Sequence, residues 1–170
     1  YSYNRIKADY SGIDVQHNEA SAQKTRISNN FISVSNTNAA FGITIPNTVT
    51  TEIFNNSVYI KSKYPLSAAF KAESGSATAG VDIRNNNFVC ANKGYALYII
   101  TPAAISEMSN NNLYTEGNFT AFWGGEYIAD LYDLQAVSGM NENSLAVYPH
   151  YLSGTDLHTI APWLDGKGSV

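Results

Sequence analysis

Four charged residues recur at one position of a repeated pattern, each three residues ahead of a pair of asparagines. They lie at intervals of 26, 30 and 25 residues: Arg26, Glu52, Asp82 and Glu107. Stacked carboxylates supply the oxygen ligands that Ca²⁺ prefers. A neighbouring arginine, here Arg84, could then remove a proton next to a uronate carboxylate. This pattern is compatible with a calcium-dependent polysaccharide lyase.

The alternative for this column is a solvated face of ion pairs. Arg26 lies beside Glu52 in the pattern, and Arg84 follows Asp82 by two residues on the same strand face. Exposed ion pairs contribute little to stability. A straight line of carboxylates also offers fewer converging oxygens than a calcium site requires. We therefore expect no catalytic residue and no cofactor here, with Ca²⁺ as the one ion to consider.

A second column has residue types suited to a sugar chain. It consists of the outward residues of a strand that follows a small residue in each repeat: Asp14, Thr44, Lys71, Tyr98 and Trp123. Aromatic rings combine an apolar body, suited to the C–H face of a pyranose, with a polar edge. The alternative is that aromatic residues occur here because strands favour them.

Cysteine and histidine suggest no further chemistry. Cys90 is the single cysteine and shares the inward strand face with Phe88, so we expect a small buried hydrophobic residue and not a nucleophile. His17, His150 and His158 show no metal-ligand spacing.

The elements that must position these columns are specified by a pattern that occurs five times. It reads apolar, any residue, Asn, Asn, any residue, apolar, over residues 27–32, 53–58, 83–88, 108–113 and, less regularly, 140–145. A period of this length indicates a solenoid. Each repeat offers three short alternating strands and no helix pattern. We predict a right-handed parallel β-helix of about five coils, spaced about 4.8 Å apart.

The paired asparagines have a physical role at the corners of such a fold. Asparagine tolerates the left-handed backbone conformation that a sharp corner requires. Where the corner recurs, the amides can stack and hydrogen-bond along the axis. We predict a ladder of Asn30, Asn56, Asn86, Asn111 and Asn143. The alternative role for these side chains is ligand binding.

Composition agrees with one β-rich domain. The 170 residues are 44% hydrophobic and only 14% charged, which favours strands with polar turns around a single core. The net charge of -4 gives no reason to expect nucleic acid or an anionic membrane as a partner. No apolar run is long enough to predict a membrane span.

Within this domain we assign residues 1–125 to coils, 126–139 to a short helix and loop, and 140–170 to the last coil and its closure. The helix prediction rests on Ile128, Leu131, Leu134 and Val137, with Gly139 as the stop. Because the first residues already resemble the inside of a repeat, we expect a fragment of a longer chain.

The C-terminal stretch carries a family resemblance. Its motifs are Tyr148-Pro149-His150-Tyr151, Asp156-Leu157-His158 and Ala161-Pro162-Trp163-Leu164-Asp165-Gly166. They resemble the ending of secreted or cell-surface right-handed β-helix proteins of bacteria, particularly of the Bacteroidota. In that ending an Asp precedes the first proline and a Ser precedes the second. This chain has Tyr148 in place of the Asp and Ala161 in place of the Ser. The resemblance implies a secreted or surface location but no activity, because the scaffold serves lyases, hydrolases and adhesins.

These observations favour a non-catalytic module that contacts a polysaccharide or another cell-surface partner through an outward strand face. One alternative is a fragment of a polysaccharide lyase or glycosidase whose catalytic coils lie partly upstream of Tyr1. Another is a structural spacer or adhesin stalk. An exposed aromatic ladder would favour the binding module. Converging carboxylates or bound Ca²⁺ would favour the enzyme, and a uniformly polar surface would favour the spacer.

Overall fold

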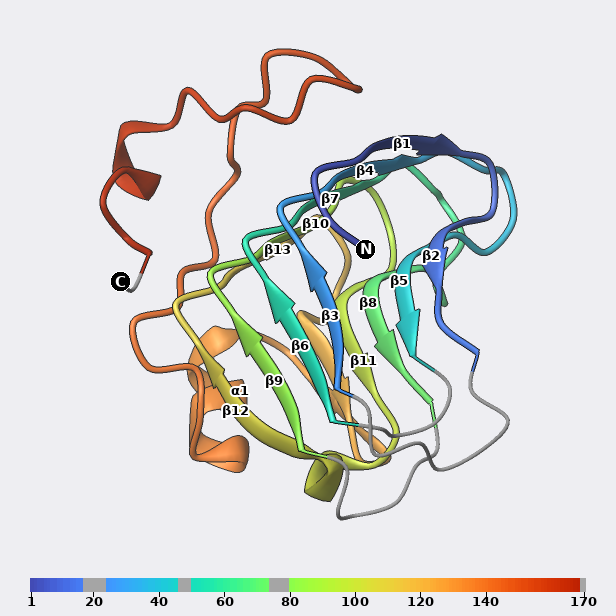
Figure 1. Cartoon of the computed structure of the whole chain (residues 1–170). Coiled ribbons are helices and arrows are strands. Elements are labelled where there is room, and N and C mark those ends of the chain that lie inside the picture. Colours follow the sequence, from blue (N-terminus) through green and yellow to red (C-terminus); the bar gives the residue numbers. More distant parts are fainter. Residues whose placement is uncertain (17–23, 46–49, 74–79, 169–170) are drawn as a thin grey trace.

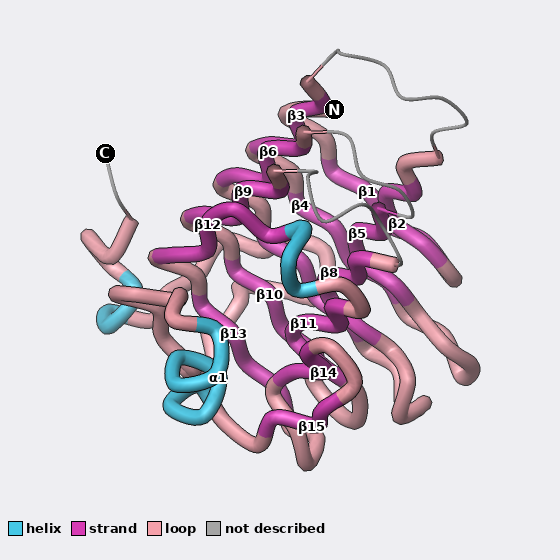
Figure 2. The backbone as a smooth tube through the Cα atoms, turned by 90° about the horizontal axis from the view of Figure 1, so that it is seen from below, coloured by secondary structure: helices cyan, strands magenta, loops and turns pink. Residues whose placement is uncertain are grey.

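The computed structural model of the chain describes residues 1–16, 24–45, 50–73 and 80–168. His17 lies outside these residues. The strands form three sheets that run side by side along the molecule (Figure 1; Figure 2). We call them sheets I, II and III.

Sheet I contains β1 (Arg5–Ala8), β4 (Phe31–Val34), β7 (Ser57–Ile60), β10 (Asn87–Cys90) and β13 (Asn112–Thr115). Sheet II contains β2 (Ser11–Asp14), β5 (Phe41–Ile45), β8 (Ala68–Ala72), β11 (Tyr95–Ile99), β14 (Ala121–Trp123) and β15 (Glu126–Ile128). Sheet III contains β3 (Thr25–Ser28), β6 (Thr51–Phe54), β9 (Val81–Arg84) and β12 (Ile105–Ser109).

Each coil adds one strand to sheet III, then to sheet I, then to sheet II. All strand pairs are parallel except β14 with β15. The chain is therefore a parallel β-solenoid, as predicted. It has about four coils, as the 4 strands of sheet III show, because the fifth sequence copy forms no strand. The right-handed sense remains the expectation for parallel crossovers.

The core fills the space between the three sheets. The apolar residue that opens each repeat points inward from sheet III and is almost completely buried: Ile27, Ile53, Ile83 and Met108. The facing residues of sheet I are fully buried as well: Ile32, Val58, Phe88 and Leu113. Burial of one such side chain stabilises the fold by about 1.5–3 kcal/mol. Stacking equivalent residues from coil to coil thus makes one continuous core.

Four asparagines form the predicted ladder at the corner between sheets III and I: Asn30, Asn56, Asn86 and Asn111. The Nδ2 of each donates to the Oδ1 of the next, at 2.8, 3.0 and 3.1 Å. The same Oδ1 atoms accept the preceding asparagine's backbone N–H at 3.1, 3.0 and 3.0 Å. The residue before each ladder asparagine is left-handed, with φ between 53° and 59°. The ladder is therefore a structural device, and its side chains are buried.

The prediction that Asn143 is the fifth member of the ladder was wrong. Glu142 pairs with Ser109, so the last copy is shifted by one residue relative to the sequence alignment. Asn143 consequently takes the left-handed corner position, with φ 56°, and Ser144 takes the ladder position. At the other end Asn4, which the repeat pattern did not include, donates from Nδ2 to the ladder at 2.9 Å.

The predicted helix exists but begins later than expected. Residues 126–128 form β15, antiparallel to β14, and α1 spans Leu131–Ser138. Asp130 caps α1 by accepting the Asp133 N–H at 2.9 Å, and Gly139 ends it with φ 65°. The hairpin and helix cover the C-terminal end of the solenoid, which would otherwise expose strand edges. No helix in the described chain has the length and apolar character needed to cross a membrane.

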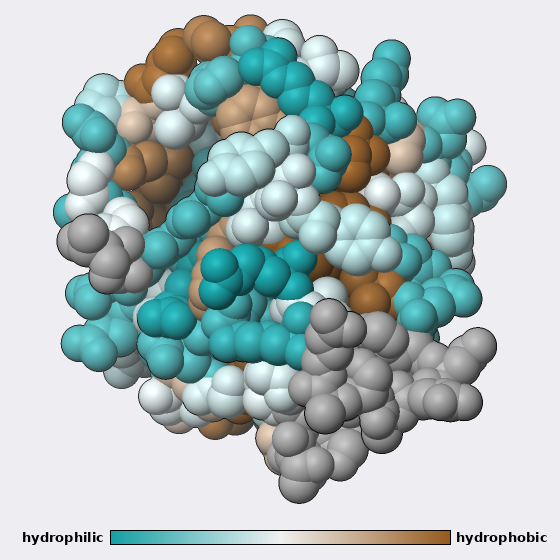
Figure 3. Space-filling view, in the orientation of Figure 1, coloured by the Kyte–Doolittle hydropathy of each residue, from teal (hydrophilic) through white to brown (hydrophobic). Residues whose placement is uncertain are grey.

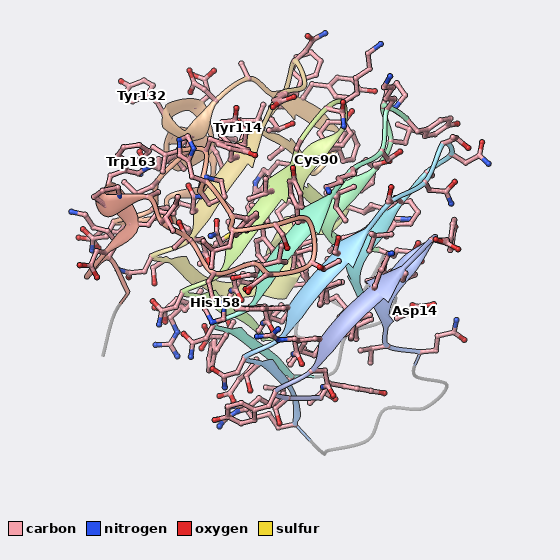
Figure 4. The ribbon with its side chains drawn as sticks, turned by 90° about the horizontal axis from the view of Figure 1, so that it is seen from above. Asp14, Cys90, Tyr114, Tyr132, His158 and Trp163 are labelled. Carbon is pink, nitrogen blue, oxygen red and sulfur yellow. The ribbon has the colours of Figure 1, made fainter. Side chains whose placement is uncertain are left out.

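Beyond α1, residues 146–168 return across the outer face of sheet I, and Figure 4 shows the segment that carries His158 lying over these strands. We call this segment the C-terminal strap; it contains the 3₁₀ turn Pro162–Leu164. Three ring pairs fix it, with centroid distances of 5.4, 5.2 and 4.8 Å: Tyr114 with Tyr148, Tyr59 with Tyr151, and Phe31 with His158. The Ser33 Oγ also donates to the Gly154 carbonyl at 2.6 Å.

Candidate functional site

The charged column lies on the outer face of sheet III in the predicted register. Arg26 is opposite Glu52, which is opposite Asp82, which is opposite Glu107. Glu52 is only 6% exposed and accepts a hydrogen bond from the Arg26 Nε at 2.6 Å, with Lys24 paired to its other oxygen. Figure 3 shows hydrophilic side chains gathered across this front face.

The second carboxylate of the column is also held by a cation. Arg84 donates to both oxygens of Asp82 at 2.8 Å. The Arg84 guanidinium also lies 4.8 Å from the centroid of the Phe54 ring. Ring and carboxylate together fix this side chain along the strand.

These contacts oppose the chemistry that a lyase would need. The hydrogen bond to Asp82 raises the pKa of Arg84 above its ordinary value, which leaves even less of the neutral form that could accept a proton. Burial raises the pKa of Glu52, but hydrogen bonds from Lys24 and Arg26 outweigh burial and leave it below 4.5. Among residues 1–16, 24–45, 50–73 and 80–168, no three His, Cys, Asp or Glu side chains cluster as a metal site. Glu52 and Asp82, the two central carboxylates of the column, are therefore held in ion pairs.

The sugar-suited column on sheet II is in register for its first four members. Asp14, Thr44, Lys71 and Tyr98 are aligned across β2, β5, β8 and β11. The next residue in the column is Phe122, not Trp123. The prediction of Trp123 as an outward contact was wrong, since it pairs with Ile99, is 7% exposed and belongs to the core.

The error has a local cause. In β11 the small residue Ala96 and the following Leu97 both face the core, so the outward residue comes second after Ala96. In β14 the small residue Ala121 pairs with Leu97, so the outward residue comes directly after it. A shift of one residue turns every side chain of a strand to the other face. Phe122 therefore points outward.

Aromatic rings continue the column beyond Tyr98. Tyr98 and Phe122 stack with centroids 4.5 Å apart and an interplanar angle of 13°. Tyr127, on β15, meets Phe122 edge to face at a centroid distance of 5.5 Å. It also packs on Phe119 at 5.1 Å, with an interplanar angle of 30°. Tyr127 is 59% exposed and Phe119 36%. Together with Lys71, whose ammonium lies 5.9 Å from the Tyr98 ring centroid, these four residues make up what we call the aromatic face.

Tyr127 was missed because residues 126–137 were interpreted as one helix. A signal was present in Gly124-Gly125, a two-residue link of the kind that favours a tight hairpin. Both glycines have positive φ, 61° and 104°, and they join β14 to β15. The hairpin places Tyr127 directly opposite Phe122.

The remaining candidates are structural. Cys90 is fully buried, its Sγ lies 2.9 Å from the Lys93 carbonyl, and burial raises the pKa of its thiol to about 12. His158 packs on Phe31 and hydrogen-bonds Asp156, which holds the strap against sheet I. His150 lies between the rings of Tyr148 and Trp163 within the strap.

Comparison with known proteins gives no family. A scan of protein-family models and searches of curated proteins and of solved structures find no match to this chain. The bacterial, secreted character suggested by the C-terminal motifs therefore remains a prediction, and function must be argued from geometry.

Proposed function

We propose that this chain is a non-catalytic module of a secreted or surface-attached bacterial protein, and that it contacts polysaccharide through the aromatic face. The observation that carries the proposal is the unbroken run from Lys71 through Tyr98 and Phe122 to Tyr127. Adjacent strands are about 4.8 Å apart. A linear polymer lying along the solenoid axis would thus meet one of these side chains at every strand.

The ring geometry suggests how contact would divide among these residues. Because Tyr98 and Phe122 stack on each other, each uses one ring face within the protein. Tyr127, at the end of the run, is the most exposed ring and is suited to stacking on a sugar. Lys71 pairs with Glu73 at 2.6 Å, so this end of the face offers both donors and an acceptor for hydroxyl groups.

The same surface supports binding more than hydrolysis. Glycosidases use two carboxyl groups on either side of the scissile bond. Glu73 contacts the aromatic face through its ion pair with Lys71, and no ion pair in the described residues brings a second carboxylate to Lys71. The carboxylates of sheet III lie on another face, where Glu52 and Asp82 are held by cations.

The test is a glycan-array screen of the folded chain, with Ca²⁺ and with chelator, followed by titration of any ligand found. The variant is Tyr127→Ala, which removes an exposed ring with little expected loss of stability. Its matched control is Tyr132→Ala, because Tyr132 is a 78% exposed tyrosine on α1. We expect Tyr127→Ala to weaken binding at least tenfold and the control to leave it unchanged.

Three results would overturn the proposal: no glycan bound by the wild type, equal weakening by both variants, or binding that disappears with chelator. The last would transfer the function to a calcium-dependent site. Thermal melts of each variant confirm that the comparison is made between folded proteins.

A further inference from the structure

A concavity of about 270 Å³ lies between the corner of sheets III and I and the end of the C-terminal strap. Its wall includes corner amides from successive coils and two leucines: Asn85, Asn87, Asn110, Asn112, Leu145 and Leu164. We call it the amide groove. The end of the strap lies beside the corner in both ribbon views (Figure 1; Figure 2) and is tied there by Asn110, whose Nδ2 donates to the Lys167 carbonyl at 3.0 Å.

The repeat explains why amides line this groove. The two central corners of the groove each have three successive asparagines, at residues 85–87 and 110–112, and the middle one of each enters the buried ladder. The residue before it, such as Asn85 or Asn110, is left-handed, with φ 59° and 53°. The residue after it, such as Asn87 or Asn112, starts a strand of sheet I. Successive coils repeat this arrangement, so the wall presents amides in two rows.

Part of this wall is held in place and part is available. Asn112 is fixed by three hydrogen bonds: its Nδ2 donates to Asn87 Oδ1 at 2.7 Å and to the Val147 carbonyl at 2.8 Å, and its Oδ1 accepts the Val147 N–H at 2.9 Å. The Asn87 Nδ2 and the Asn110 Oδ1 have no partner in the described part of the chain. One free donor and one free acceptor are therefore presented at fixed positions.

The lining determines the class of ligand. Amides donate and accept hydrogen bonds without charge. Among the described residues that line the groove there is no carboxylate, and Lys167 is the one cation. Leu145 and Leu164 add an apolar surface. The volume is slightly below the ≈ 300–1,000 Å³ of drug-sized pockets. We propose that the amide groove binds one neutral sugar residue, with Asn87 and Asn110 hydrogen-bonding its hydroxyls and the leucines covering its C–H face.

The test is an NMR titration of the ¹⁵N-labelled chain with free neutral hexoses and N-acetylhexosamines at millimolar concentration. We expect the amide signals of residues 85–87 and 110–112 to shift. In Asn87→Ala the affinity derived from the titration should fall at least fivefold. Asn38→Ala is the control, because Asn38 is an exposed asparagine outside the groove. Tyr127→Ala should leave this titration unchanged, which separates the groove from the aromatic face.

Two further arms keep the test decisive. Asn110→Gly removes the other proposed sugar-binding amide while keeping the left-handed backbone, φ 53°, that glycine adopts readily, so it covers the case in which Asn87→Ala does not fold. Glucuronate and inorganic sulfate serve as anionic probes. Absence of shifts with every neutral sugar would overturn the proposal. So would stronger shifts with the anions, which would assign the groove to Lys167, or shifts confined to Tyr127 and its neighbours.

Discussion

The Asn111 backbone N–H donates to the Ser144 Oγ at 3.0 Å, in the position where each earlier coil supplies an asparagine Oδ1. A hydroxyl therefore terminates the ladder. The amide of the preceding residue, Asn143, does not enter it, because Asn143 occupies the left-handed corner. One side chain closes a hydrogen-bond column that runs through the whole solenoid.

The first prediction concerns this closure. Ser144→Ala leaves the buried Asn111 N–H without an acceptor and should lower the free energy of unfolding by about 1–3 kcal/mol. Asn143→Gly should change it by only a few tenths of a kcal/mol, because glycine accepts positive φ. Urea denaturation of both variants measures the difference. A larger loss in Asn143→Gly than in Ser144→Ala would contradict the shifted register.

A mid-ladder substitution should cost more. Asn86 donates to the Ile53 carbonyl at 2.7 Å and to Asn111, and accepts from the N–H and Nδ2 of Asn56 at 3.0 Å. We expect Asn86→Ala to lower the unfolding free energy by about 3 kcal/mol or more, because several buried groups lose partners together. Asn38→Ala serves as the exposed control. Equal stability of the two variants by urea denaturation would mean that the ladder contributes little.

Much of this architecture was readable from the repeat, because it depends on local rules. The apolar residue that opens each copy and the asparagine pair recur at one coil's spacing, which predicts inward Ile53 and Ile83 and a ladder through Asn56 and Asn86. Strand alternation also predicts the alignment of Lys71 with Tyr98. These features follow from side-chain direction and corner geometry alone.

The errors arose where one residue more or fewer changes the answer. The predictions for Trp123 and Asn143 were each shifted by one residue. In a strand, a shift of one residue turns a side chain from the surface into the core, as it does for Trp123. The amide groove and the strap contacts could not be read from periodicity at all. Gly154 meets Ser33 across 121 residues of sequence, and nothing in the repeat specifies where a non-repeating tail will lie.

The small residue Gly42, the second residue of β5 in sheet II, gives a third prediction. A Cβ added to Gly42 would lie 2.2 Å from the Val58 Cγ1 and 2.4 Å from the Ala69 carbonyl oxygen. Gly42→Ala should therefore destabilise the chain by roughly 3 kcal/mol, as overpacking does. Gly168→Ala is the control, since its nearest contact would be an ordinary 3.6 Å. Thermal melts that place both variants at the wild-type midpoint would contradict the close packing of sheets I and II.

Cys90 gives a chemical readout of burial. Its pKa of about 12, against an ordinary 9.0, reduces the thiolate fraction at pH 8 about 1,000-fold, and the thiolate is the reactive form. A disulfide reagent that absorbs on release should label the native chain at least that much more slowly than the chain in denaturant. Rapid labelling of the native chain at pH 8 would show that the core around Phe88 and Cys90 opens readily.

The last prediction concerns pH. Because the pKa of Glu52 in the folded chain lies below its ordinary 4.5, its ion pairs stabilise the fold above that pH, and the contribution disappears as pH falls through the folded pKa. Glu52→Gln should lower the unfolding free energy by about 1 kcal/mol at pH 7, a modest figure because Lys24 and Arg26 are largely exposed. The gap between wild type and variant should shrink below pH 4.5. Glu126→Gln, at an exposed glutamate without an ion pair in the described chain, should show no gap at any pH. Urea denaturation between pH 3 and 7 measures both, and a Glu52→Gln gap that stays constant across that range would show that packing, and not charge, holds this side chain.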